Sequence, residues 1–173
     1  MNGNCETCQS CGMPLTAPDA RGTEGDGTPS AYYCRYCYRN GAFTDPEATI
    51  ETMAVRGGEM MSSMFEIPPE RAQGFVLQQL RPLLRWSGRL IPSCGSCGMP
   101  IAGPGDPGTE ADDSPSDRYC THCYRCGAFV EPDLTREMMI EEFAPQLAAQ
   151  LGMPLDRATA MVTAFTATLP RWR

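Results

Sequence analysis

Eight of the ten cysteines form four Cys-x-x-Cys pairs, a spacing typical of sites that hold a metal ion. Two residues between the cysteines let the backbone turn back on itself, so both thiolates can bind one ion. Two such pairs supply four sulfur ligands, which complete a tetrahedral coordination sphere. We assign Cys8, Cys11, Cys34 and Cys37 to one metal site, and Cys94, Cys97, Cys120 and Cys123 to a second.

The cysteine pairs belong to a longer internal repeat. Cys94 follows Cys8 by 86 positions, and Trp172 follows Trp86 by the same interval. The match runs without a gap from the first cysteine pair to the tryptophan, which indicates a tandem duplication of one whole unit. We therefore expect a first copy at residues 1–86, a linker at 87–93 and a second copy at 94–173.

Each copy is too small for an apolar core alone to stabilise its fold. The 173 residues leave about 80 for each copy, and an apolar core of that size supplies only a few kcal/mol. A structural zinc ion contributes roughly 10–16 kcal/mol in small zinc peptides, because binding and folding are one equilibrium. The sequence therefore predicts a small, metal-stapled α+β fold in each copy.

Each copy divides into a cysteine-bearing front and a helical back. The fronts, at about 5–45 and 94–131, are rich in glycine and proline, which predicts turns and short strands. We call these two segments the ribbons. The backs should form two to three helices each, beginning near Asp45-Pro46-Glu47 in the first copy and Glu131-Pro132-Asp133-Leu134-Thr135 in the second.

Three features of the helical backs lead to specific expectations. Pro145 should kink or restart its helix, because proline removes a backbone donor. The glycine pair Gly57-Gly58 should fray the matching helix of the first copy. The apolar stripe of the last helix, which includes Val162 and Phe165, should pack on the ribbon.

Composition disfavours several classes of protein. The formal charge is −7, and all fourteen basic residues are arginine, so the chain lacks the basic surface on which nucleic-acid binding normally depends. No stretch approaches the roughly 20 apolar residues of a membrane span. The N-terminus lacks the basic and apolar regions of a secretory signal. We expect a reduced, cytoplasmic protein whose cysteines bind metal and do not form disulfides.

Each copy also resembles a known family. Its motifs are Cys-x-x-Cys-Gly-Met-Pro, then Gly-Thr-Glu, Tyr-Cys-x-x-Cys-Tyr-Arg and Gly-Ala-Phe, and a Leu-x-Arg-Trp type of ending at Trp86 and Trp172. In these motifs the chain is similar to the bacterial putative zinc ribbon domain family. The resemblance implies the same eight cysteine ligands, and it carries no agreed activity.

The favoured function is a non-catalytic zinc protein with two structural four-cysteine sites, two Zn²⁺ per chain and a protein partner. Four thiolates leave no coordination position for substrate, so we expect no enzyme. One alternative is a rubredoxin-like iron electron carrier, since four thiolates also hold iron. A second is a zinc ribbon that binds nucleic acid or a transcription complex, for which Arg39 and Arg125 are the candidate contacts. In the opposing interpretation, Tyr38 and Tyr124 pack on the ribbon while these arginines pair with local acids.

Three further residues lie near the sites without a clear role. Cys5 and Cys126 have no counterpart in the other copy, and they should be spare thiols; a shifted site that uses Cys5 and Cys8 is the alternative. His122, the only histidine, lies inside the last pair and should be an exposed bystander. For the whole chain we expect a monomer in which the helical backs pack about a pseudo-two-fold axis.

Overall fold

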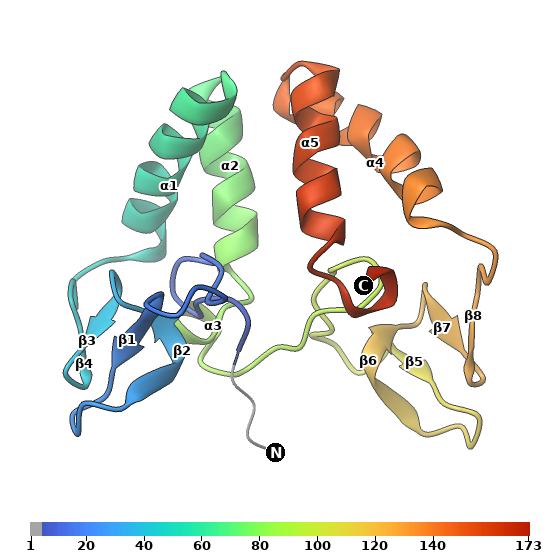
Figure 1. Cartoon of the computed structure of the whole chain (residues 1–173), viewed down its shortest axis with the longest axis horizontal. Helices are drawn as coiled ribbons and strands as arrows, with labels where there is room; N and C mark the ends of the chain where they lie inside the picture. The colour runs from blue at the N-terminus through green and yellow to red at the C-terminus, as the bar shows by residue number, and fades with distance from the viewer. Residues whose placement is uncertain (1–4) are drawn as a thin grey trace. The chain divides into compact units, whose positions relative to one another are not determined.

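The computed structural model describes residues 5–173 and divides into two compact units (Figure 1). The first unit contains Met1–Met64 and Ala72–Leu90, and the second contains Phe65–Arg71 and Ile91–Arg173. Each unit holds one cysteine group together with short antiparallel hairpins and helices, which confirms the predicted α+β, metal-stapled fold. The predicted first copy begins at residue 1, and its first four residues lie outside the described part of the chain.

Each ribbon contains two antiparallel, two-stranded sheets. In the first copy β1 (Arg21–Thr23) pairs with β2 (Pro29–Cys34), and β3 (Tyr38–Arg39) pairs with β4 (Ala42–Phe43). The second copy repeats the order with β5 (Pro107–Thr109), β6 (Pro115–Cys120), β7 (Tyr124–Arg125) and β8 (Ala128–Phe129). The longest strand of each copy ends on a cysteine, so regular structure delivers that ligand to the site.

Side-chain hydrogen bonds close the turn of each longer hairpin. Oδ1 of Asp26 accepts from the backbone N–H and the hydroxyl of Thr28, at 2.9 and 2.6 Å. Asp112 accepts in the same way from Ser114, at 3.1 and 2.6 Å. These bonds favour the charged carboxylate, so the pKa of Asp26 and that of Asp112 lie below the ordinary value. Such turns explain why the segment between the cysteine pairs is not helical.

Gly22 in β1 lies against the backbone of the second cysteine pair. A Cβ atom at this position would be 2.2 Å from the carbonyl oxygen of Tyr38 and 3.0 Å from that of Cys34. Gly108 makes the same approach to Tyr124, also at 2.2 Å. Because the obstructing atoms belong to the backbone, rotation of a side chain cannot relieve the clash.

We expect Gly22→Ala to destabilise the first copy by about 1–3 kcal/mol, because the methyl group overpacks a site walled by backbone. Gly25→Ala is the matched control, since a Cβ there meets no atom within 4 Å. Urea unfolding of the metal-loaded chain measures the difference. Equal midpoints for the two variants would contradict the role assigned to Gly22.

The helical backs repeat in order and length. The first copy has α1 (Ile50–Phe65), α2 (Pro69–Leu80) and the short α3 (Leu84–Ser87). The second has α4 (Arg136–Leu151), α5 (Leu155–Thr166) and a 3₁₀ turn, η1 (Pro170–Trp172). Among the described residues, no helix combines the length and apolarity needed to cross a membrane.

The first helix of the first copy begins later than the sequence suggested. Asp45-Pro46-Glu47 forms a turn, and α1 starts at Ile50. The Oγ1 atom of Thr49 accepts from the N–H of Thr52 at 3.2 Å, and Thr135 caps α4 through Met138 at the same distance. A threonine hydroxyl satisfies a free N–H of the first turn, which proline and nearby acids do not do. The helix-start prediction was therefore wrong by about one turn in the first copy, whereas in the second the predicted segment ends on Thr135, the cap itself.

The glycine pair does not fray α1, so that prediction was also wrong. The helix runs through both residues, because they allow α2 to approach closely. A Cβ on Gly58 would lie 2.7 Å from Cα of Gln73, and one on Gly57 would lie 2.9 Å from Cγ1 of Val76. The backbone entropy that glycine costs is thus offset by closer packing of two helices.

The second copy corrects two further expectations. Helix α4 continues through Pro145 without interruption. Helix α5 packs chiefly against α4, with Ala158 and Val162 buried. Only the end of its apolar stripe reaches the ribbon, where the ring of Phe165 lies on the first knuckle at Gly98. Nε of Arg136 donates to the hydroxyl of Thr166 at 3.1 Å, which ties the start of α4 to the end of α5. Each helical back is therefore chiefly a pair of antiparallel helices that supports the ribbon from one end.

Candidate metal centre

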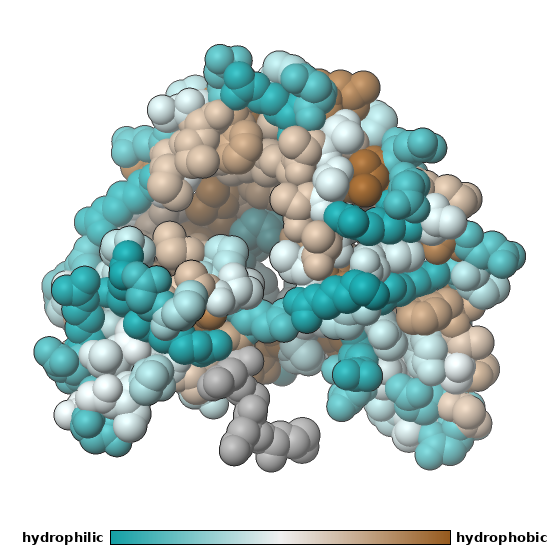
Figure 2. Space-filling view, in the orientation of Figure 1, coloured by the Kyte–Doolittle hydropathy of each residue, from teal (hydrophilic) through white to brown (hydrophobic). Residues whose placement is uncertain are grey.

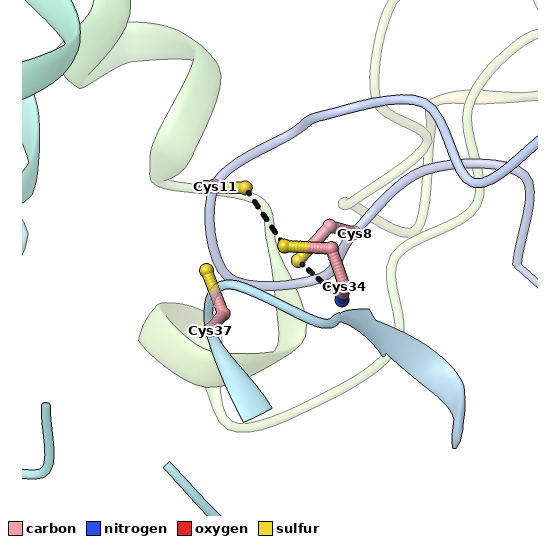
Figure 3. A group of neighbouring side chains, drawn as sticks. All are labelled: Cys8, Cys11, Cys34 and Cys37. Atoms are coloured by element: carbon pink, nitrogen blue, oxygen red, sulfur yellow. Dashed lines mark hydrogen bonds between the residues drawn. The ribbon is translucent and has the colours of Figure 1, made fainter. Parts of the chain in front are cut away.

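The structure brings the four predicted ligands of the first copy together. All four Sγ atoms, those of Cys8, Cys11, Cys34 and Cys37, lie within 4.8 Å of one another. Figure 3 shows their side chains reaching one another from two separate loops. Leu15 is buried with them, and Tyr33 and Met53 pack against the group. The site is thus the centre of the ribbon's small core.

The second copy repeats the arrangement. Its group contains Cys94, Cys97, Cys120 and Cys123, with their Sγ atoms again within 4.8 Å of one another. Ile101 is buried in the position equivalent to Leu15, and Tyr119 packs against the group. All eight cysteines assigned from the sequence therefore fall into two groups of four.

The sulfur spacing fits a tetrahedral ion. Four thiolates bound to zinc at about 2.3 Å lie about 3.8 Å from one another. The structure places Sγ of Cys11 and Cys34 at 3.7 Å, and those of Cys97 and Cys120 also at 3.7 Å. A disulfide needs about 2.05 Å, and all ten cysteines of the chain are free thiols. The donor set therefore fits a metal, and four thiolates leave no open coordination position.

The first loop of each site is a tight knuckle. The N–H of Cys8 donates to the carbonyl of Met13 at 2.8 Å, and the N–H of Gly12 donates to the carbonyl of Cys8 at 2.9 Å. Gly12 has a φ of 76°, and its counterpart Gly98 has 75°. This left-handed backbone suits glycine, as expected from the residue that follows the pair. The N–H of Cys34 then donates to Sγ of Cys8 at 3.2 Å, which stabilises negative charge on the sulfur.

The thiols of one group shift one another's protonation. Hydrogen bonds from Cys11, Cys34 and Cys37 to the sulfur of Cys8 hold its pKa far below the ordinary value. The pKa of Cys11 is raised by its hydrogen bonds to the other three and by burial. The first thiol of the group therefore loses its proton easily, and each further thiolate is disfavoured because its charge repels the first. A bound divalent cation would offset this repulsion, so the four sulfurs are suited to hold one.

The C-terminal tryptophan of each copy binds the first knuckle of the same copy. Nε1 of Trp86 donates to the carbonyl of Ser10 at 2.7 Å. Nε1 of Trp172 donates to the carbonyl of Ser96, also at 2.7 Å. Both serines lie between the two cysteines of a pair and are almost fully buried. The end of the unit therefore holds the loop that carries the metal ligands.

The arginine before each tryptophan extends this contact. Arg85 donates to the hydroxyl of Ser10 at 3.1 Å and to the carbonyl of Asp45 at 2.6 Å. Its guanidinium carbon lies 4.0 Å from the ring centre of Phe43 and 4.6 Å from that of Trp86. Such stacking favours arginine over lysine. We call Arg85 and Trp86, with Arg171 and Trp172, the C-terminal clamps.

The second clamp makes the same set of contacts in the second copy. Arg171 donates to the hydroxyl of Ser96 at 3.1 Å and to the carbonyl of Glu131 at 2.5 Å, and it stacks over Phe129 at 3.9 Å. From the sequence, the tryptophans marked the ends of the copies and the last residues of the apolar stripe, and their hydrogen bond to the cysteine loop was not predicted. The signal that could have found the clamp is the 86-residue interval, which also relates Ser10 to Ser96 and Arg85 to Arg171.

The aromatic residues near the second pair belong to the ribbon's packing. Tyr38 contacts Tyr33 and Phe43, with ring centres 5.0 and 5.3 Å apart. The equivalent cluster of the second copy forms around Tyr124. Nε of Arg39 donates to the carbonyl of Arg35 at 2.8 Å. Arg125 likewise donates to a carbonyl, so the expected pairing of these two arginines with acids was wrong.

The three remaining residues lie outside both sulfur groups. Cys5 donates its N–H to the carbonyl of Ala31 at 3.0 Å and belongs to neither group, which disfavours the shifted site. Cys126 is exposed, with a positive φ of 50° next to Gly127. His122 is also exposed and lies outside the group of its own pair.

Comparison with known proteins identifies the repeated unit. The sequence model of one family, described as putative zinc ribbon domain, matches residues 7–87 and again residues 93–173. The comparison with curated proteins found no match, and neither did the comparison with solved structures. The two matches cover nearly the whole chain, and each contains one group of four cysteines. The chain therefore belongs to the putative zinc ribbon domain family, of which it carries two tandem copies.

Proposed function

We propose that the chain is a non-catalytic zinc protein in which each four-cysteine site is structural and a protein surface carries the function. The observation that supports this most is the closed donor set, four sulfurs spaced for a tetrahedral ion with no other metal-binding side chain in either group. Catalytic zinc keeps a position for water or substrate. Zinc also suits a role without redox change, whereas iron in the same site would serve electron transfer.

Metal analysis tests the choice between the two ions. Chain purified without chelators should be colourless and should contain two zinc ions per polypeptide. A red protein with a thiolate-to-iron absorption band would overturn the proposal in favour of an iron electron carrier. Fewer than two ions per chain, after addition of excess zinc under reducing conditions, would contradict the two-site assignment.

A protein-binding surface is supported by differences between the copies. In α1, Val55 and Met60 are large apolar residues that remain exposed. The matching residues of α4 are Glu141 and Gln146. Methionine is flexible and polarisable, which suits a surface that adapts to a partner. At these two positions the first copy presents apolar side chains and the second polar ones, while the exposed apolar residues of α4, Met138 and Phe143, lie at other positions.

The substitutions Val55→Glu and Met60→Gln test this surface, because they install the residues of the second copy. A partner recovered with the metal-loaded chain should bind it as a purified protein, and the double variant should weaken that binding. Glu141→Gln, on the opposite copy, is the control and should leave binding unchanged. Recovery of nucleic acid, with binding that falls steeply as salt rises, would contradict the proposal and support the nucleic-acid alternative.

A further inference from the structure

The helices and cysteine loops of the first copy line an open cavity of about 580 Å³. Its apolar walls are Met53 and Met60 from α1, Val76 and Leu80 from α2, and Met13 from the first knuckle. This volume falls within the roughly 300–1,000 Å³ of small-molecule sites in proteins. Figure 2 shows apolar residues, coloured tan, gathered over the helices of this unit in the upper left of the view.

The second copy covers its knuckle with an aromatic ring of its own. A Cβ atom on Gly98 would lie 2.2 Å from Cζ of Phe165, so the ring rests directly on the knuckle. A Cβ on Gly12, the matching residue of the first copy, meets no atom within 4 Å. The residue that matches Phe165 is Gln79, whose side chain is exposed. The first copy therefore lacks the ring that covers the knuckle in the second.

A second ring is missing from the same region. Gly57 lines the cavity, and the residue at this position in the second copy is Phe143. The two copies are otherwise alike in the length of these helices and in the knuckle geometry. Of the two positions at which the second copy has phenylalanine and the first does not, Gly57 lines the cavity itself, and Gln79 lies next to its wall residue Leu80 in the sequence.

The polar groups of the cavity already have partners. Arg56 forms an ion pair with Asp45 at 2.7 Å. Arg85 is held by the hydroxyl of Ser10 and by the rings on which it stacks. With a divalent ion bound, the adjacent four-cysteine site would carry a net charge of about −2, which would repel anions. These contacts favour a neutral ligand over a charged one.

We propose that this cavity binds a small neutral molecule with an aromatic ring, which rests on Gly12 as the ring of Phe165 rests on Gly98. Aromatic faces pack well against apolar and sulfur-containing side chains, and the cavity offers methionines on two sides. The inference goes beyond the structural role of the metal, and it holds whichever ion occupies the site. It gives the first copy a ligand-binding role that the second lacks.

Methionine methyl NMR tests the proposal on the whole metal-loaded chain. Benzyl alcohol is the probe, benzoate is the anionic comparison and cyclohexylmethanol is the non-aromatic one. Benzyl alcohol should shift the methyl signals of Met13, Met53 and Met60 in a saturable way, while Met99 and Met139 of the second copy stay in place. The other two compounds should bind at least about tenfold more weakly. Equal binding of cyclohexylmethanol would overturn the assignment of an aromatic ligand.

Two exchanges between the copies supply matched variants. Gln79→Phe places the missing ring in the first copy, and it should lower the affinity for benzyl alcohol at least about tenfold. Phe165→Gln uncovers the second knuckle and should transfer the response to Met99 and Met139. Both variants must retain two metal ions, which separates loss of the cavity from loss of the fold. Absence of a saturable shift in the natural chain, or an unchanged response after Gln79→Phe, would overturn the proposal.

Discussion

Replacement of Cys34 by alanine should remove one metal ion per chain and unfold the first ribbon, while the second ribbon keeps its ion and its structure. Cys34 is fully buried, and its sulfur lies 3.7 Å from that of Cys11. The remaining three thiolates would hold a metal in an incomplete coordination sphere. Since a structural zinc ion supplies on the order of 10 kcal/mol to a unit of this size, a large part of the folding free energy is lost.

The two tryptophans give a separate signal for each copy. Both indole N–H groups donate to a knuckle carbonyl at 2.7 Å, so each indole NMR signal should depend on the metal site of its own copy. Cys34→Ala should move the signal of Trp86 to its unfolded position and leave that of Trp172 unchanged. Cys120→Ala should produce the reverse. Retention of two metal ions by either variant would contradict the ligand assignment.

Cys126→Ala is the control for both cysteine variants. Its side chain is exposed and lies outside both sulfur groups. The variant should keep two ions and both indole signals. A lost ion in this variant would show that Cys126 takes part in the second site, and the four-cysteine group would then need revision.

The sequence was most informative where the requirements of metal coordination restrict the backbone. A Cys-x-x-Cys pair can bring two sulfurs to one ion only through a narrow turn, so the pattern predicts both the ligands and the local backbone. The glycine after the pair at Gly12 and Gly98 indicated the left-handed turn that the structure contains. The repeat predicted two tandem copies, which the family matches confirm, and the structure contains one four-cysteine group in each.

The sequence was less informative where the outcome depends on contacts between distant segments. Gly58 predicts a weak helix if only local propensity is considered. The structure keeps the helix because the missing side chain lets Gln73 of α2 approach to within 2.7 Å of a Cβ position. This contact is not visible in composition or periodicity. The start of α1 was misjudged for a different, local reason, since the cap is the hydroxyl of Thr49, three residues before Thr52, and not the preceding Pro46.

The difference between the copies also became interpretable only in the structure. The exchange of Phe165 for Gln79 is a single position in the repeat alignment. Its consequence depends on the ring lying on Gly98, a contact between the end of α5 and a knuckle nearly 70 residues earlier. The divergence along the helices therefore alters the surface beside the metal site, although the ligands themselves are the same.

The C-terminal clamp should control how tightly the first copy holds its metal. Trp86→Ala removes a half-buried ring, a 2.7 Å hydrogen bond to the carbonyl of Ser10 and the surface on which Arg85 stacks. We expect a loss of about 3 kcal/mol in the unfolding free energy of the first copy. Because Ser10 lies between two ligands, the affinity of that site for its ion should also fall about 10–100-fold.

Competition with a chromogenic chelator measures this effect for each site. The natural chain should release its two ions at similar chelator concentrations, and Trp86→Ala should release one ion much earlier. Trp86→Phe keeps most of the packing and loses the hydrogen bond, so it should cost only about 1 kcal/mol. Trp172→Ala is the matched variant and should weaken the second site alone, because its indole binds Ser96. If both tryptophan variants release their ions like the natural chain, the clamp stabilises only the helices and has no influence on the metal, since the knuckle would then hold its geometry without it.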